Sequence, residues 1–129
     1  MQQLPLGVRL RDRATFETFE PGEQQQLLVH LRALAAGRRG VTWIWGPAGS
    51  GRTHLLQAVC TAAARSVRAG YLPLAELATA GPAVLEGWTG IDVLCIDDLD
   101  TVAGRDDFDR ALFSLYRDVE ERGAGLLVA

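Results

Sequence analysis

The chain has 129 residues, 48% of them apolar and 22% charged, and a formal net charge of −3. This length and composition predict one folded domain with its own core, and they exclude a disordered chain and a pair of domains. The acidic balance argues against a surface that binds nucleic acid along its whole extent. No apolar run approaches the ~20 residues of a membrane span, and the first residues lack a signal-peptide pattern, so we expect a cytoplasmic protein that does not touch membranes.

The first third of the chain predicts an arm, a helix and a strand. Residues 1–13 are mixed in character and contain a proline and a glycine, so we expect an extended arm ahead of a domain over 14–129. Leucines at three- and four-residue steps predict a helix over 23–36, ended by glycine. The β-branched and aromatic run 41–45 predicts a short buried strand.

The middle of the chain predicts a helix, a strand and a broken helical stretch. Small and apolar side chains on one face predict a helix over 53–65. A short strand is expected at 71–74, where Pro73 favours the edge of a sheet. Residues 75–88 are expected to be helical in part. The two cysteines lie in apolar runs and are expected to be buried and reduced: Cys60 and Cys95.

The last third predicts two buried strands around the most amphipathic helix. The apolar run 91–96 is typical of a parallel strand buried on both faces. Residues 107–122 place apolar side chains on one face and charges on the other, which predicts a helix, and 125–129 begin another strand. Alternation of strand and helix predicts an α/β fold, a parallel sheet with helices on both faces in three layers. Since no helix follows the last strand, we expect this fold to be incomplete at the C-terminus.

A glycine-rich segment after the first strand fits a phosphate-binding loop. Residues 46–53 match G-x-x-x-x-G-K-[ST] with Arg52 in place of lysine. Glycines let successive backbone N–H groups surround a phosphate, and the next helix adds the positive end of its dipole. Arg52 would offset phosphate charge, and the Thr53 hydroxyl would ligate Mg²⁺. The predicted nucleotide site comprises Gly46, Pro47, Ala48, Gly49, Ser50, Gly51, Arg52, Thr53 and His54.

Two alternatives accompany this loop. A structural glycine turn is the plain interpretation, and the strand before and the helix after favour phosphate binding over it. His54 on the first helical turn is open to packing or capping as well as to a phosphate or base contact.

A pair of acids ends the strand at 91–96. Asp97 and Asp98 follow four apolar residues, as in the Walker B strand of nucleoside triphosphatases. Asp97 would hold Mg²⁺ through water, and Asp98 would orient the attacking water. A solvated turn is the alternative, which the upstream phosphate loop disfavours. The guanidinium of Arg52 is planar, whereas the ammonium of the usual lysine is compact. Asp98 also has a shorter side chain than the glutamate that is often found at this position. We therefore expect slow or absent ATP hydrolysis.

Other side chains give weaker indications. Phe16 and Phe19 precede the first helix, and both core packing and a wall for an adenine ring remain open for them. His30 lies on the first helix and is expected to be solvated. The tryptophans are expected in the core rather than as stacking platforms: Trp43, Trp45 and Trp88.

Three segments together resemble a known family. They are Thr-Phe-Glu-Thr-Phe at 15–19, the loop continuing into Thr-His-Leu-Leu at 53–56, and Cys-Ile-Asp-Asp-Leu at 95–99. They are similar to the AAA+ domain of the DnaA family of bacterial replication initiators, over nearly the whole chain. The resemblance implies a P-loop NTPase fold of the AAA+/ASCE type, a bound ADP or ATP with Mg²⁺, and a role in DNA replication initiation.

Within the family the chain is most similar to the Hda type, which lacks the initiator's DNA-binding domain. The domain begins almost at the first residue, and arginine replaces the loop lysine, as in Hda-type members. A short motif in the arm resembles the one with which Hda-type members dock on the DNA polymerase sliding clamp; it comprises Gln3, Leu4, Pro5 and Leu6. The alternative is that these residues are part of a plain disordered terminus.

This closer resemblance implies a regulator with named partners. It would act with the DNA polymerase III sliding clamp (beta subunit) to promote inactivation of ATP-bound DnaA, and so inhibit re-initiation. The protein would contact DNA only indirectly. The resemblance is also compatible with a homo-oligomer. The arginine finger, sensor residues and lid would lie beyond residue 129. The AAA+ core of DnaA itself, a helicase-loader-type ATPase and a module that no longer holds nucleotide remain as alternatives.

Overall fold

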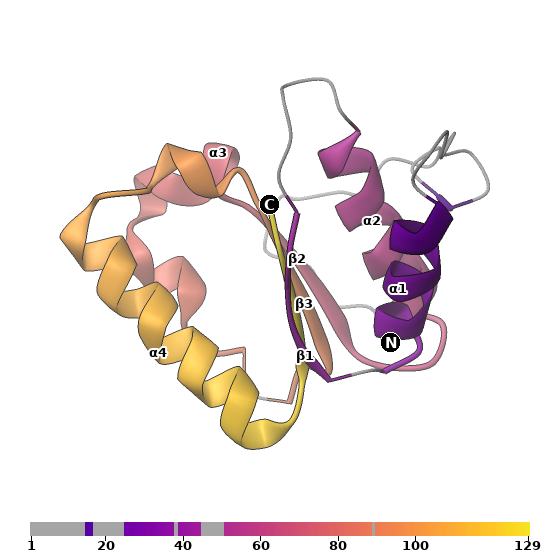
Figure 1. Ribbon diagram of the computed structural model, residues 1–129. Helices are drawn as coiled ribbons and strands as arrows, with labels where there is room; N and C mark the ends of the chain where they lie inside the picture. The colour runs from indigo at the N-terminus through magenta and orange to yellow at the C-terminus, as the bar shows by residue number, and fades with distance from the viewer. Residues whose placement is uncertain (1–14, 17–24, 38, 45–50, 89) are drawn as a thin grey trace.

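A four-stranded parallel sheet lies between two helical layers in the computed structural model (Figure 1). The structure describes residues 15–16, 25–37, 39–44, 51–88 and 90–129. The sheet order is β1-β4-β3-β2, with β1 Gly40–Trp43, β2 Ala69–Pro73, β3 Val93–Asp97 and β4 Gly125–Val128. The predicted three-layer α/β fold is confirmed.

Each face of the sheet carries its own helical layer. Helices α1 (Gln25–Ala35) and α2 (Arg52–Ala63) cover one face, and α4 (Asp106–Arg122) covers the other with α3 (Leu74–Leu77) (Figure 1). Short 3-10 turns complete the second layer and the β3–α4 connection: η1 Ala78–Ala80, η2 Pro82–Leu85 and η3 Leu99–Thr101. Two apolar clusters result, one on each side of the sheet.

The two central strands are buried along their whole length, and β3 is apolar up to its last residue, Asp97. Every residue of β3 and of β4 is buried, as expected for parallel strands covered on both faces. β2 is the strand at one end of the sheet, which confirms the edge position predicted from Pro73. Pro73 pairs with Asp97 in the parallel register, so β2 and β3 end side by side.

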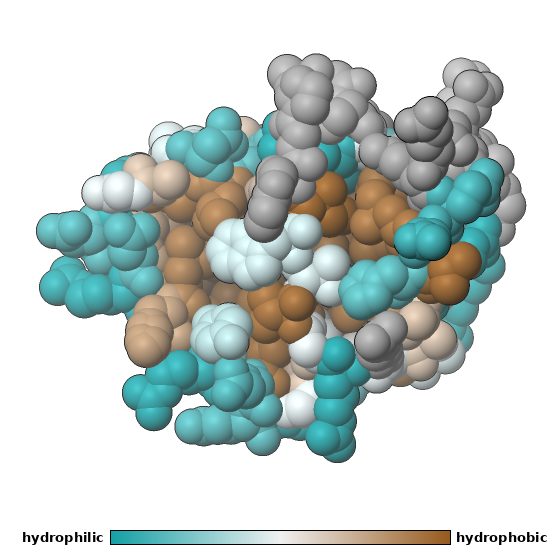
Figure 2. Space-filling view, viewed as in Figure 1, coloured by the Kyte–Doolittle hydropathy of each residue, from teal (hydrophilic) through white to brown (hydrophobic). Residues whose placement is uncertain are grey.

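The first strand differs from its prediction. β1 lies at the other end of the sheet and is only partly buried, and Trp43 at its end is 52% exposed. Trp43, Phe113 and Tyr116 flank an apolar groove of about 220 Å³ between β1 and α4, where Figure 2 shows apolar side chains gathered on the surface. The predictions of a buried strand and of a core position for Trp43 were therefore wrong, because the helical layers leave this end of the sheet partly uncovered, whereas β2 at the other end is buried throughout.

The helices follow the predicted periodicity closely. Leu28, Leu31 and Leu34 bury one face of α1 at three-residue steps. α4 ends at Gly123, whose φ of 70° is left-handed, as helix-ending glycines usually are. Both cysteines are free and buried as expected, and burial raises the pKa of Cys60 to about 12. Across the described ranges, each helix is too short or too polar to cross a bilayer.

Candidate nucleotide site

The carboxyl ends of the parallel strands meet at one edge of the sheet, at the top of Figure 1. From this edge the chain leaves β1 toward α2 on one face and leaves β3 toward α4 on the other. Ligands of open α/β sheets bind where connections diverge in this way. The strand before the predicted phosphate loop and the strand that carries the acid pair therefore end at the same edge, with β4 between them.

Backbone conformation accounts for the glycine that precedes α2. Gly51 has φ 89° and ψ 13°, in the left-handed region, and its carbonyl accepts the N–H of Leu55 at 3.0 Å. A side chain at this position would be strained. The remaining loop residues, 46–50, lie outside the described residues, so the phosphate cradle itself stays a prediction.

The first turn of α2 is chemically suited to an anion. It carries no acidic side chain, and its first backbone N–H groups have no partner within the helix. Arg52 and Thr53 are half-buried on this turn. The positive end of a twelve-residue helix, with a cation at its first position and no acid in its first turn, favours phosphate binding here.

His54 on the same turn makes a contact away from the loop. Its Nε2 lies 2.8 Å from the carbonyl oxygen of Thr15, to which it donates. This bond links the start of α2 to the segment before α1, and it supports the packing interpretation of His54. A nucleotide contact by this ring stays a prediction.

Asp97 is a buried carboxylate with two hydrogen-bond donors. It is 3% exposed; the Tyr71 hydroxyl donates to its Oδ2 at 2.8 Å, and the backbone N–H of Asp98 donates to its Oδ1 at 2.9 Å. Burial raises the pKa of Tyr71, so the phenol keeps the proton that it donates. None of the ion pairs formed within the described ranges includes Asp97.

This arrangement fits a metal ion supplied together with a phosphate ligand. A buried carboxylate without a cationic neighbour is costly, and a divalent cation would offset its charge. The described part of the chain brings no three His, Cys, Asp or Glu side chains together as a metal site. Mg²⁺ commonly binds through one or two carboxylates and completes its shell with water and substrate phosphates, which is the kind of site that Asp97 and Thr53 would make.

Asp98 has an unusual backbone and a perturbed side chain. Its φ of 61° and ψ of 40° are left-handed, a conformation that often marks functional positions in residues other than glycine. Burial and the charge of Asp97 raise the pKa of its carboxyl, while a hydrogen bond from the backbone of Ala75 and the charge of Arg52 lower it. The influence of Arg52 connects the two halves of the site electrostatically, and the bond to Ala75 anchors Asp98 at the start of α3.

Two residues of the site were missed by sequence reasoning. Gln57 and Tyr71 are 4% and 3% exposed, and Gln57 Nε2 donates to the Tyr71 hydroxyl at 3.3 Å. The available signal was a glutamine inside the apolar face of a predicted helix. Buried polar groups need partners, so such a residue indicates a polar contact without revealing which one.

The weaker candidates separate into packing residues and residues that the structure does not describe. Phe16 is buried in the cluster on the α1–α2 side, with the Arg32 guanidinium 4.7 Å from its ring centroid. Core packing is thus confirmed for Phe16, and its adenine contact stays a prediction. His30 was expected to be solvated, but it is half-buried and its Nε2 lies 2.9 Å from Thr42 Oγ1 on β1. Trp88 packs against the other cluster as expected. Outside the described residues lie Gln3, Leu4, Pro5, Leu6, Phe19 and Trp45.

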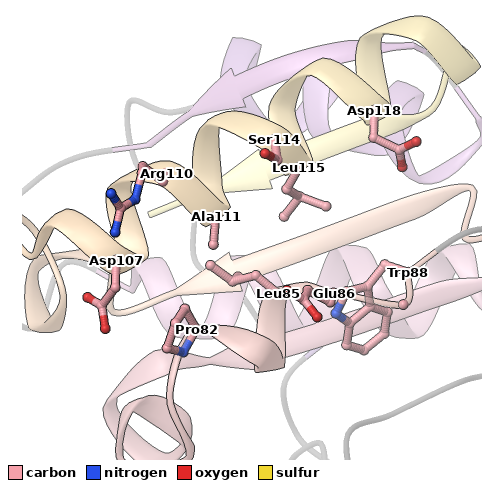
Figure 3. Close-up of a pocket in the computed structure, with 11 residues that line it drawn as sticks. Pro82, Leu85, Glu86, Trp88, Asp107, Arg110, Ala111, Ser114, Leu115 and Asp118 are labelled. Atoms are coloured by element: carbon pink, nitrogen blue, oxygen red, sulfur yellow. The ribbon is translucent and has the colours of Figure 1, made fainter.

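A separate pocket lies on the far helical layer. It measures about 510 Å³ between α4 and η2, with Leu85 and Leu115 on its walls and Asp107, Arg110 and Asp118 around it (Figure 3). None of the predicted site residues lines it, so it does not contribute to the nucleotide site.

No protein-family model matches the sequence. Solved structures, however, share the arrangement of helices and strands described above. Domain III of the replication initiation protein DnaA from Thermotoga maritima superposes with a TM-score of 0.74 at 23% identity, over 94% of this chain and 57% of that one. A replication initiator DnaA bound to AMPPCP and single-stranded DNA gives 0.71 at 23% identity, over 93% and 42%. The chain has the P-loop NTPase fold of the AAA+ type.

A third solved structure has the same fold. A putative primosome component from Streptococcus pyogenes serotype M3 gives a TM-score of 0.69 at 15% identity, over 99% of this chain and 75% of that one. The chain spans about half the length of the DnaA chains that it matches. At these identities the likeness establishes the fold.

Proposed function

We propose that this protein binds ADP or ATP with Mg²⁺ at the carboxyl edge of its sheet and regulates the initiation of bacterial DNA replication. The observation that carries the nucleotide site is the juxtaposition of two features. One is a helix that begins after a left-handed glycine with a cation and no acid in its first turn. The other is the buried carboxylate of Asp97, which forms no ion pair with the residues that the structure describes. The likeness to a DnaA bound to AMPPCP supports an adenine nucleotide as the ligand.

The residues of the chain divide the binding among them. The loop and the first N–H groups of α2 hold the phosphates, and Arg52 offsets their charge. Thr53 and Asp97 hold Mg²⁺, which would neutralise the negative charge on the phosphates when bound. Asp98 orients water near the terminal phosphate, although its bond to Ala75 and the planar shape of Arg52 favour slow or absent hydrolysis.

The regulatory role rests on resemblance to Hda-type proteins. In this proposal the ADP-bound protein docks on the DNA polymerase sliding clamp through its arm and promotes inactivation of ATP-bound DnaA. The shared fold with DnaA domain III supports contact between two AAA+ modules of the same type. The cytoplasm is the compartment in which these partners act.

A second candidate function is a DnaA core or a helicase-loader-type ATPase. This second candidate is supported by the likeness to a putative primosome component, of which the chain covers 75%. Both candidates use the same nucleotide site, and they differ in whether the protein hydrolyses ATP without a partner. Efficient phosphoryl transfer in the isolated protein, well above about 1 per minute, would favour the ATPase.

Nucleotide binding is tested by Gly51→Val. Valine would be strained at φ 89° and its branched side chain would fill space that the phosphate needs. We expect the wild-type chain to gain about 2.7 kcal/mol of stability at 100 times the Kd of ADP, and the variant to show no thermal shift and no calorimetric binding.

The matched control is Gly104→Val. Gly104 has a similar φ of 83°, and nothing lies within 4 Å of an added Cβ there. The control should bear the same backbone strain and still bind ADP. Unchanged ADP affinity in Gly51→Val would overturn the nucleotide site.

A further inference from the structure

Three buried side chains form a hydrogen-bonded chain from α2 to the carboxylate of Asp97. Gln57 donates to the Tyr71 oxygen at 3.3 Å, and Tyr71 donates to Asp97 Oδ2 at 2.8 Å. A phenol has one proton to donate. Because the Gln57 N–H occupies a lone pair of the phenol oxygen, the phenol proton is directed to the carboxylate.

Both oxygens of Asp97 are held, each by one donor. Oδ2 accepts from Tyr71, and Oδ1 accepts from the backbone N–H of Asp98 at 2.9 Å. The carboxylate cannot rotate without breaking one of these bonds. Each oxygen has a further lone pair, so the group can still accept from a metal-bound water or bind a metal directly.

We propose that Tyr71 is the positioning residue for the Mg²⁺ that accompanies the nucleotide. Tyr71 lies on β2, outside both sequence motifs, and reaches the acid because β2 pairs with β3 in a register that sets Tyr71 opposite Cys95. Gln57 lies one helical turn after Thr53 on α2. The network thus joins the helix that carries one metal-binding side chain to the strand that carries the other. This inference rests on the proposed nucleotide site.

The expected consequence is selectivity between metals. Mg²⁺ demands near-ideal octahedral geometry, whereas Ca²⁺ accepts irregular shells with longer bonds. A carboxylate fixed by two donors therefore benefits Mg²⁺ more than Ca²⁺. Partners that orient metal ligands typically contribute 10–100-fold to metal affinity.

The test is Tyr71→Phe in the full chain, with ADP affinity measured by calorimetry in EDTA, in Mg²⁺ and in Ca²⁺. We expect the affinity in EDTA to match the wild type. The gain in ADP affinity on adding Mg²⁺ should fall by about tenfold or more, and the gain with Ca²⁺ should change less. An unchanged Mg²⁺ gain overturns the proposal, as does an equal loss in all three buffers, because that result indicates a packing role alone.

Two further variants complete the experiment. Tyr116→Phe, at a 41% exposed tyrosine on α4, is the matched control and should leave all three affinities unchanged. Gln57→Met keeps the side-chain volume but releases the phenol oxygen, so a smaller selective loss of the Mg²⁺ gain is expected. Should Tyr71→Phe not fold, that selective loss supports the proposal and its absence overturns it.

The outcomes separate this inference from the proposed function. A wild-type chain that binds ADP in none of the three buffers overturns both. ADP binding that Gly51→Val abolishes, combined with equal Mg²⁺ gains in Tyr71→Phe and wild type, overturns the positioning role and leaves the nucleotide site standing.

Discussion

Asp98 combines a left-handed backbone with a half-buried carboxyl beside a second acid. It is the one residue other than glycine with positive φ among those that the structure describes. Its raised pKa means that the folded protein holds the Asp98 proton more tightly than the unfolded chain does. The stability that this proton contributes is fully present below the ordinary carboxyl pKa and is lost as the pH rises through the raised value.

Asp98→Asn should therefore stabilise the unliganded protein at neutral pH. Asparagine tolerates the left-handed region and keeps an oxygen for the Ala75 bond, but it carries no charge beside Asp97. We expect a Tm a few degrees above the wild type at pH 7, measured by circular dichroism, and convergence of the two Tm values below about pH 4. Glu86→Gln, at an exposed acid that does not act on Asp98, should show little change; a lower Tm for Asp98→Asn at pH 7 would contradict this account.

Residues in contiguous motifs could be predicted from the sequence, and residues brought in by the fold could not. Arg52 and Thr53 were proposed for the site from the spacing of one motif, and Asp97 from its place at the end of an apolar run; the structure confirms that run as the buried strand β3. Tyr71 reaches Asp97 only through the register between β2 and β3, and no local pattern encodes a register between strands that are far apart in sequence.

The C-terminal end of α4 shows how one glycine shapes an element. Gly123 has φ 70°; its N–H donates to Glu120 O at 3.3 Å, and the Ala124 N–H donates to Val119 O at 3.0 Å. These bonds close the last turn and direct the chain into β4. The stop at this glycine was predictable, because left-handed helix ends favour residues without a Cβ.

Gly123→Ala should destabilise the fold by about 1–2 kcal/mol, since the alanine must adopt a left-handed conformation. Urea unfolding measures this cost. An added Cβ would also come within 2.9 Å of the Arg39 side chain, so the control is the same change in an Arg39→Ala background. The cost should persist there, and its disappearance would attribute the effect to the arginine contact instead.

Element boundaries departed from prediction where side chains bind the backbone. The strand expected from 91 begins at Val93. Just before it, Asp92 is joined to Arg68 by two bonds: the Arg68 N–H donates to the Asp92 carboxylate at 2.9 Å, and the Asp92 N–H donates to Arg68 O at 2.8 Å. The burial of β1 was misjudged for another reason. Hydrophobicity identifies a strand, but how far the helices and turns around it extend decides how much of it is covered: β1 and β2 are both outer strands, and only β2 is buried throughout.

At the scale of the whole molecule, the alternation of elements predicted the layers but not the strand order. The order β1-β4-β3-β2 arises from long-range pairing, which composition and periodicity do not encode. At this scale the proposed function depends on partner proteins. The arm motif is the feature of the sequence from which we predict such a partner. Docking of that arm on the sliding clamp is a separate prediction from nucleotide binding.

Replacing Leu4 and Leu6 together by alanine should weaken capture by the purified clamp by about tenfold or more, because each leucine would bury its side chain in an apolar cleft. ADP affinity should stay at the wild-type value. Val8→Ala, an apolar truncation in the same arm outside the motif, is the control and should bind the clamp normally. Equal capture of both variants would remove the clamp from the proposed function.

The position of β4 between β1 and β3 has a consequence for biosynthesis. A ribosome makes the predicted phosphate loop first, the acid pair later and β4 after both, yet the strands that precede the loop and the acids, β1 and β3, are joined only once β4 has inserted between them. A nascent chain that stops short of β4 has both halves of the site without their spacing. If the protein binds nucleotide as proposed, binding would report that the sheet has formed, and ADP and ATP would stabilise chains that have folded through β4 in preference to shorter nascent chains.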